Sequence, residues 1–178
     1  MSERPVRTAP SALVRYAAFH RDRRNIVMHC AGIPLVVFAL GVLLARPSAG
    51  GISLAWIAWA LTTGWYLTRG HLGLGVAVSA VNALLMAAAQ PVAALSLAAC
   101  LGWGVASFIA GWTAQMVGHW YEGRTPPLAS DLAGLPAGPM FVVAEWLSIA
   151  GLGRGLMADL ERRVGPTMLR DLAHPITR

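Results

Sequence analysis

The feature that most constrains this chain is a series of long segments without a charged side chain. Arg24 and Arg46 enclose 21 residues that include no Asp, Glu, Lys or Arg, and 22 more such residues lie between Arg46 and Arg69. A third segment of 52 uncharged residues ends at Glu122 and is interrupted near its middle by a Gln-Pro pair. Each segment, with the third divided in two, matches the roughly 20 apolar residues that cross a hydrocarbon core of about 30 Å. The chain is therefore expected to be an integral membrane protein.

The composition supports this interpretation and excludes a disordered chain, a coiled coil and an ordinary cytosolic enzyme. Hydrophobic residues make up 56% of the 178 residues and charged residues only 12%, about half of the charged fraction of a typical soluble domain. All 14 basic residues are arginines and eight residues are acidic, which gives a net charge of +6. With so much apolar sequence, the partner of that charge is expected to be membrane lipid and not nucleic acid. The two cysteines form no spaced pair with the histidines, which argues against a disulfide framework or a zinc finger.

The uncharged segments predict an all-α fold, a helical bundle with four transmembrane helices in a single membrane domain. The expected spans are residues 28–45, 52–68, 72–89 and 92–117. Pro91 suits the first turn of the fourth span, where its missing N–H is harmless. A fifth apolar stretch, from Met140 to Gly153, is short for a span and includes Glu145. It is expected to form a re-entrant or interfacial helix near the C-terminus.

The distribution of arginines predicts the orientation in the membrane. If the N-terminus is cytoplasmic, 13 of the 14 arginines lie on the cytoplasmic side and only Arg46 lies on the other. This asymmetry follows the positive-inside rule and predicts a multi-pass protein with both termini in the cytoplasm. The parts of the domain are then an Arg-rich cytoplasmic N-terminus, a four-span block, a site loop with the short helix, and a cytoplasmic tail: residues 1–24, 25–117, 118–153 and 154–178. Four histidines fall near the cytoplasmic ends of spans: His20, His29, His71 and His119.

The first group of candidate functional residues surrounds the start of the first span. Its pattern, Tyr-x3-His-x4-Asn-x3-His-x2-Gly-x-Pro, covers residues 16–34. On one continuous helix His20 and His29 would be nine residues apart and half a turn out of phase, so they can bind one metal only if the helix is broken between them. Asp22 or Asn25 can supply the break as an N-cap. The alternative is that His20 lies at the membrane interface and His29 forms hydrogen bonds at a helix end.

A second group follows the fourth span, in residues 118–128. His119 and Glu122 are three residues apart and therefore share a helix face, and Gly123 is suited to end the helix. A neutral imidazole is a good ligand for iron, zinc or copper, and the carboxylate could orient it or bind the metal as well. Alternatively, His119 pairs with Glu122 while Arg124 reaches lipid phosphates.

A third group, Gly-Pro-x-Phe-x3-Glu, ends at Glu145. A carboxylate within an apolar segment is costly and usually faces a partner inside the protein. Glu145 can support an imidazole, act as counter-ion to an arginine, or make a structural polar contact. His71 is expected to be a solvated residue at the interface, and His174 an ordinary residue of the tail. The chain contains no GxSxG, no phosphate-binding glycine loop and no HExxH, which argues against the chemistries that those motifs support.

Taken in order, these motifs resemble those of the 2-hydroxy fatty acid dioxygenases, a family of small polytopic proteins of fungal and plant endoplasmic reticulum and of many bacteria. The resemblance rests on residues 16–34 and 118–145, about a quarter of the chain. It implies an iron(II)-dependent α-oxidation, in which a 2-hydroxy long-chain acid and O2 give CO2 and a fatty acid one carbon shorter. It also implies that the chain lies in a bacterial inner membrane or the endoplasmic reticulum.

Carried onto this chain, the resemblance implies three iron ligands, His20, His29 and His119. The other residues expected to contribute to catalysis are Asn25, Glu122, Arg124 and Glu145. A 2-hydroxy acid can chelate one metal through its carboxylate and hydroxyl, and three protein ligands leave those positions open. Arg124 or Arg24 could hold the substrate carboxylate before it reaches the metal, while the acyl chain lies among the apolar helices.

Two other functions are compatible with the sequence. A non-enzymatic scaffold or small transporter explains the small residues of the spans and Glu145 without any metal. A membrane haem protein could use His29 and His119 as axial ligands, but His20, Asn25 and Glu122 would then have no role. The sequence leaves the oligomeric state open.

Overall fold

The computed structural model describes residues 9–69, 71–124 and 135–173. Within these ranges the regular elements are helices apart from one short antiparallel pair, β1 (Ser48–Ala49) with β2 (Ile52–Ser53). The helices are α1 (Ser11–Ala17), α2 (Arg23–Ala45), α3 (Leu54–Leu67), α4 (Leu72–Ala93), α5 (Leu97–Glu122), α6 (Ala137–Ile149) and α7 (Arg154–Val164). The prediction of an all-α fold is confirmed.

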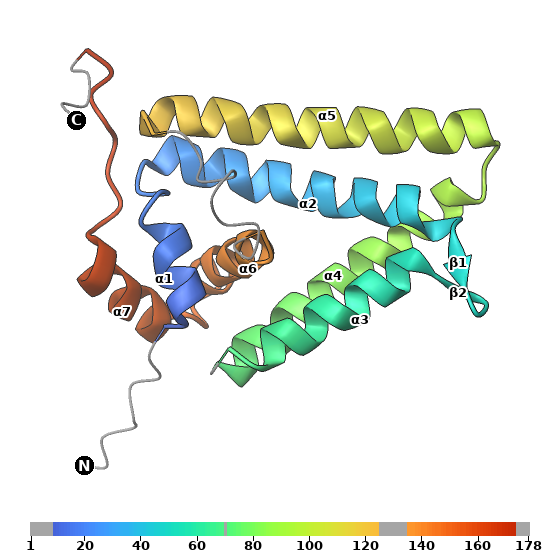
Figure 1. Cartoon of the computed structure of the whole chain (residues 1–178). Helices are drawn as coiled ribbons and strands as arrows, with labels where there is room; N and C mark the ends of the chain where they lie inside the picture. The colour runs from blue at the N-terminus through green and yellow to red at the C-terminus, as the bar shows by residue number, and fades with distance from the viewer. Residues whose placement is uncertain (1–8, 70, 125–134, 174–178) are drawn as a thin grey trace.

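Two long helices, α2 and α5, lie antiparallel beside each other, and the α3–α4 hairpin is inclined to them (Figure 1). The N-terminus of α2 and the C-terminus of α5 therefore share one end of the molecule. The short helices α1, α6 and α7 pack against one another near that end. Segments from the beginning, the middle and the end of the chain consequently meet there.

Glycines allow α2 and α5 to approach closely. A Cβ atom added to Gly32 would lie 2.5 Å from the carbonyl oxygen of Gly111, and one added to Gly111 would lie 2.6 Å from the carbonyl oxygen of Gly32. Nearer the shared end, a Cβ on Gly118 would collide with the side-chain oxygen of Asn25 and lie 3.1 Å from Nδ1 of His29. A side chain at any of these positions would push the helices apart. The glycines therefore set the distance between α2 and α5.

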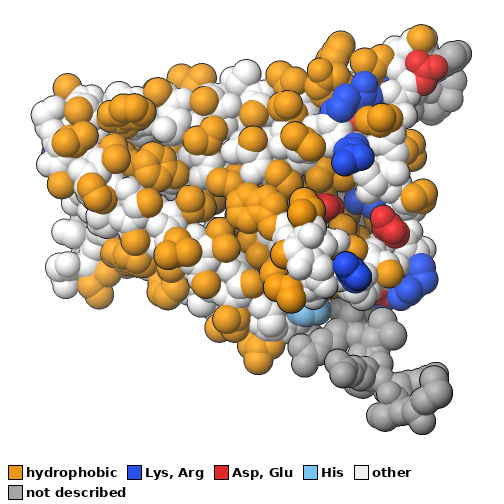
Figure 2. Space-filling model, turned by 180° about the vertical axis from the view of Figure 1, so that it is seen from behind, with side chains coloured by type: hydrophobic (Ala, Val, Ile, Leu, Met, Phe, Trp, Pro, Cys, Tyr) orange, Lys and Arg blue, Asp and Glu red, His pale blue; other side chains and the backbone are white. Residues whose placement is uncertain are grey.

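Three helices of the described structure, α2, α4 and α5, are long and apolar enough to cross a membrane. The outer surface of α5 is rich in large apolar side chains: Leu101, Trp103, Val105, Ile109 and Val117. Figure 2 shows one face of the molecule covered largely by apolar side chains, with the charged ones gathered toward one end. The second predicted span corresponds to α3, whose 14 residues extend for only about 21 Å. The fourth transmembrane helix is thus not confirmed.

The boundary between the third and fourth predicted spans differs from the prediction. Pro91 does not begin a helix, because α4 continues through it to Ala93. A proline so close to the end of a helix removes a single backbone hydrogen bond, and α4 ends two residues later. The next helix starts after Ser96, whose hydroxyl accepts a hydrogen bond from the N–H of Ala99 at 3.3 Å. The start of α5 is therefore set by a serine N-cap and not by the proline.

The short apolar helix predicted near the C-terminus is α6, and its 13 residues are fewer than a span requires. Most of its first half is buried: Ala137, Gly138, Met140, Phe141, Val142, Val143 and Ala144. It packs against α1, α2, α4 and α7 and so forms part of the core beside the shared end. The Pro-Pro-Leu part of the second motif lies outside the described residues.

Candidate metal centre

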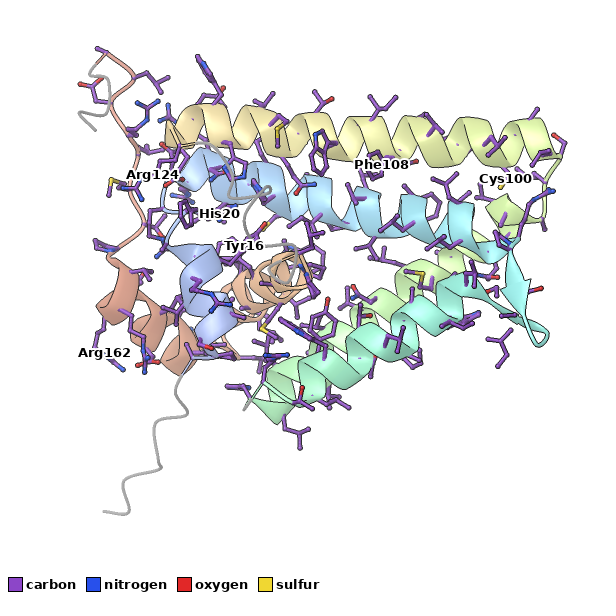
Figure 3. All side chains as sticks on the ribbon, viewed as in Figure 1. Tyr16, His20, Cys100, Phe108, Arg124 and Arg162 are labelled. Carbon is purple, nitrogen blue, oxygen red and sulfur yellow. The ribbon has the colours of Figure 1, made fainter. Side chains whose placement is uncertain are left out.

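Three histidines from separate segments come together at the end shared by α2 and α5. His20 lies in the turn between α1 and α2, His29 in the second turn of α2, and His119 in the last turn of α5. A ligand nitrogen of each lies within 4.8 Å of the other two. All three side chains are buried, with at most 7% of their surface exposed. The three residues predicted as metal ligands therefore form one buried cluster, and Figure 3 shows His20 beside the first turns of α2.

The helix break that this arrangement requires occurs at Asp22. After α1 ends at Ala17, the extended backbone of Asp22 starts α2, and its carboxylate accepts the N–H of Arg24 at 2.8 Å. Of the two N-caps that the sequence allows, Asp22 is the one used. The break lets His20 fold back over the first turns of α2, so that it meets His29 although the two would lie on opposite faces of a continuous helix.

Backbone carbonyl groups fix the protonation of two of the rings. Nδ1 of His20 lies 2.7 Å from the carbonyl oxygen of Tyr16, and Nδ1 of His29 lies 3.0 Å from that of Asn25. Because a carbonyl oxygen can only accept, each Nδ1 carries a hydrogen, and in the neutral ring Nε2 then keeps a lone pair. The two Nε2 atoms lie 3.1 Å apart. Two lone pairs at that distance repel each other unless a cation lies between them.

The third ring completes a site that suits a metal ion. Nδ1 of His119 is buried and has no hydrogen-bond partner among the described residues. Metal–imidazole bonds of about 2.0–2.1 Å place two nitrogens roughly 3 Å apart when the bonds are at right angles. Burial, together with the neighbouring His29 ring, holds the pKa of His20 well below its ordinary value, so its Nε2 is available to a metal. Three neutral imidazoles are good ligands for iron, zinc, copper or nickel.

Glu122 supports the cluster from outside it. Its carboxylate accepts the backbone N–H of Arg21 at 3.0 Å, the backbone N–H of Asp22 at 2.8 Å and the side-chain amide of Asn25 at 3.0 Å. These hydrogen bonds join the end of α5 to the turn between α1 and α2. The sequence predicts that Glu122 orients or joins the ligand His119, whereas its hydrogen bonds in the described structure hold the neighbouring turn instead.

Aromatic side chains hold the His20 ring in place. Tyr16 stacks on it with ring centroids 4.1 Å apart and planes 6° apart, and Phe141 of α6 lies 5.4 Å from both rings. Burial, with Cys30 as a second cause, raises the pKa of Tyr16, so its hydroxyl remains a hydrogen-bond donor at neutral pH. Both aromatic residues belong to the sequence motifs, but their packing against His20 depends on the tertiary fold.

Asn25 and Glu145, two further predicted site residues, lie outside the ligand cluster. Nδ2 of Asn25 donates to the carbonyl oxygen of Phe19 at 3.1 Å and to Glu122, so Asn25 holds the turn. Oε1 of Glu145 is buried without a hydrogen-bond partner in the described part of the chain. Burial raises the pKa of Glu145, and the guanidinium of Arg21 acts in the opposite direction.

A cavity of about 860 Å³ adjoins the three histidines. Along α2 its wall extends from His29 to Leu44, which is roughly 22 Å of helix. The lining is mostly apolar, and the residues that face the cavity from α2, α3 and α5 include Val36, Leu40, Trp59, Phe108 and Trp112. In Figure 3, Phe108 lies well along α5 from His20. The volume is within the usual range of small-molecule sites, and the shape suits a molecule with a metal-binding head and a long apolar tail.

The arginines predicted to hold a carboxylate do not line this cavity. Arg24 pairs with Asp22 at 2.7 Å, and Arg124 is exposed and donates to the carbonyl oxygen of Ala18 at 3.3 Å. Ala18 lines the cavity, so Arg124 lies next to the wall without being part of it. Among the described lining residues the one charged side chain is Arg15, which the motifs did not single out.

His71 has a structural role away from the cluster. Its Nδ1 accepts a hydrogen bond from the N–H of Leu74 at 3.1 Å and so caps the start of α4. His174 lies outside the described residues. The fold thus separates the three clustered histidines from a fourth that also lies at a helix end.

Comparison with known families agrees with this geometry. Residues 6–149 match the family model described as Mpo1-like, 2-hydroxy-palmitic acid dioxygenase Mpo1-like. The chain belongs to the Mpo1-like family. The resemblance found in the motifs is confirmed, and all three clustered histidines lie within the part that matches the Mpo1-like model. Comparisons with curated proteins and with solved structures give no match.

Proposed function

We propose that this chain is an iron(II)-dependent dioxygenase of 2-hydroxy long-chain fatty acids. The reaction takes a 2-hydroxy acid and O2 and gives CO2, water and a fatty acid that is one carbon shorter. The observation that carries this proposal is the pair of Nε2 atoms 3.1 Å apart, with a third imidazole beside them, at one end of a largely apolar cavity. The description of the family supplies the substrate class.

The chemistry of the donor set fits iron. His20, His29 and His119 would hold the ion, and bound iron would supply the redox chemistry that O2 needs to react with a fatty acid. Three imidazoles leave coordination positions for the adjacent carboxylate and hydroxyl oxygens of a 2-hydroxy acid. An ordinary fatty acid lacks the second of these oxygens, so the site should favour the hydroxylated substrate.

The residues of the cavity would bind and orient the substrate. The apolar wall between Ile33 and Leu44 takes the acyl chain and excludes water from it. Arg15 attracts the carboxylate, and the protonated hydroxyl of Tyr16 is a donor for substrate oxygen. With the tail fixed along α2, C1 and C2 of the acid lie at the histidine end, where the reacting bond must be.

We also propose that the chain crosses the membrane four times, with the histidine end near the cytoplasm. The helices α2 and α4 run in the same direction in Figure 1, so α3 must return the chain between them. Its 14 residues make a short crossing of about 21 Å. Thirteen of the 14 arginines then lie on the cytoplasmic side. A long-chain acid dissolved in the bilayer can reach the cavity without leaving the membrane.

The haem alternative does not suit the cluster. The rings of His29 and His119 are in contact, with centroids 4.9 Å apart, and a porphyrin plane does not fit between two rings at that distance. The scaffold and transporter alternatives leave the facing Nε2 atoms without an explanation.

The experiment is an assay of the detergent-purified protein after anaerobic loading with iron(II). We expect 2-hydroxypalmitate and O2 to be consumed in equal amounts, with CO2 and the C15 acid as products, and palmitate to be left intact. The matched control is the His119→Ala variant, which should consume neither substrate. Iron-loaded protein that leaves 2-hydroxy acids of every chain length unchanged would refute the proposed reaction.

A further inference from the structure

The C-terminal tail crosses the end of the molecule where the three histidines lie. After α7, residues 165–173 run as an extended strap past the N-terminus of α2 and the C-terminus of α5 (Figure 1). This strap follows the part of the chain that matches the family model, which ends at residue 149. Its contacts are therefore a property of this chain that the family match does not describe.

The strap pairs with the backbone of the turn between α1 and α2. The N–H of Met168 donates to the carbonyl oxygen of Arg21 at 2.8 Å, and its carbonyl oxygen accepts the N–H of Arg23 at 2.9 Å. Together these form a parallel bridge opposite Asp22. The guanidinium of Arg21 adds a hydrogen bond to the carbonyl oxygen of Gly165 at 2.9 Å. The strap thus holds both sides of the helix break that allows two histidines to meet.

Arg170 connects this turn to the end of α5. Its backbone N–H donates to Oδ2 of Asp22 at 2.8 Å, the carboxylate that caps α2. Its guanidinium donates to the carbonyl oxygens of Tyr121 at 2.8 Å and Trp120 at 3.3 Å. Both carbonyls belong to the last turn of α5, where a cation is favoured, and that of Trp120 also accepts the N–H of Gly123 at 3.2 Å. A single residue therefore bridges the start of one ligand-bearing helix and the end of the other.

We propose that Arg170 is a positioning residue of the metal centre, which fixes the separation of the helix ends that present His29 and His119. The three ligands lie on segments far apart in sequence, so contacts outside the ligand set must determine their relative positions. Glu122 makes such contacts from within the protein, and Arg170 makes them from the outer surface. The inference rests on the proposed metal site but not on the substrate or the reaction.

The test measures cobalt(II) binding to the full-length protein in detergent, with cobalt(II) as a coloured probe of the site. We expect Arg170→Ala to weaken the affinity about 10–100-fold and to change the visible ligand-field spectrum, because the ligands are then less well held. Arg170→Lys should recover part of the loss, since an ammonium can reach one carbonyl oxygen but lacks the planar fork. The control is Arg163→Ala, another arginine of the C-terminal region, which pairs with Asp159 at 3.1 Å and should bind cobalt(II) like the wild type.

The possible outcomes separate this inference from the proposed function. A wild-type affinity and spectrum in Arg170→Ala would overturn it, as would an equal loss in Arg163→Ala. If Arg170→Ala does not fold, as judged by circular dichroism and gel filtration, Arg170→Lys decides: an unchanged spectrum and affinity overturn the inference, and a weakened site supports it. Failure of the wild-type chain to bind cobalt(II) or iron(II) would overturn both the inference and the proposed function.

Discussion

The two ends of the α2–α5 pair are constructed differently. At the histidine end, Glu122, Asp22 and Arg170 form hydrogen bonds that join the end of α5, the start of α2 and the C-terminal strap. At the far end, Arg46 donates to the carbonyl oxygen of Ala93 at 2.8 Å, and the adjoining cavity wall is apolar. Side-chain hydrogen bonds therefore join α2 to α5 directly at the histidine end, as between Asn25 and Glu122. At the far end the bond of Arg46 joins α2 to the end of α4, and α5 meets α2 mainly through packing, as where Leu43 lies against Gly104.

This difference corresponds to what each end must do under the proposed function. Ligand atoms have to lie at set distances from one ion, and misplacement of the helix ends by a fraction of an ångström changes those distances. An acyl chain needs only a channel of suitable length and width, which apolar packing supplies. Substitutions at the two ends should thus have effects of different kind and size.

The largest effect is expected from removing a ligand. His119→Ala should reduce both bound iron and turnover to background, because the two remaining imidazoles are too few to hold the ion in this buried site. Iron content and O2 consumption of the purified variant measure this. His71→Ala is the control, since His71 caps α4 away from the cluster. Full activity in His119→Ala would remove this residue from the ligand set.

The next largest effect tests the close approach of the helices. Gly118→Ala places a methyl group against Asn25 and His29, so α5 must move away from α2 or tilt. We expect metal affinity to fall about 10–100-fold and stability to fall by about 1–3 kcal/mol. Gly102→Ala is a matched control on the same helix, because an added Cβ there meets nothing within 4 Å. Equal metal affinities in the two variants would show that helix separation does not set the site.

A smaller effect is expected at the apolar end. Leu44→Trp fills the far part of the cavity, so activity toward the longest 2-hydroxy acids should fall by about tenfold relative to shorter ones, while bound iron stays unchanged. The ratio of kcat/KM for long and short substrates measures this. Leu61→Trp serves as the control, since Leu61 is 71% exposed. An unchanged ratio in Leu44→Trp would mean that the acyl chain lies elsewhere.

The smallest effect is expected in the way the stability of the metal-free protein depends on pH. The pKa of His20 in the folded state is held well below its ordinary value of 6.5 by burial and by the His29 ring. As the pH falls through about 6.5, the unfolded chain binds a proton that the folded chain resists, so stability decreases toward acid. The midpoint of thermal unfolding should therefore fall between about pH 7 and pH 5. The unfolding midpoint of His20→Gln should depend less on pH. If the midpoints of the variant and the wild type fell equally between pH 7 and pH 5, His20 would not be the cause.

The sequence predicts the long helices and the break before α2, because patterns of charge and residue spacing indicate them. Uncharged segments locate the long helices, and the spacing of His20 and His29 requires a break that an N-capping residue provides. The choice between Asp22 and Asn25 stayed open, because both residue types are good caps and the decision depends on contacts with Glu122 and the strap.

Other features leave no comparable signal. The strap binds the turn largely through backbone groups and Arg170, which many sequences could supply, so no motif indicates it. Residues 48–53 are uncharged like the spans, so the absence of charge alone does not show that α3 begins only at Leu54, after the β1–β2 turn. The role of Pro91 was mistaken because proline is tolerated near a helix end when α4 stops soon afterwards.

The central claim is that the three histidines form one metal site without haem. The most direct test is the metal content and visible spectrum of the purified, detergent-solubilised protein, measured before and after anaerobic iron(II) loading. The account predicts about one iron per chain and no Soret band, with the iron lost in His119→Ala. A Soret band, or no bound metal even after loading, would contradict it.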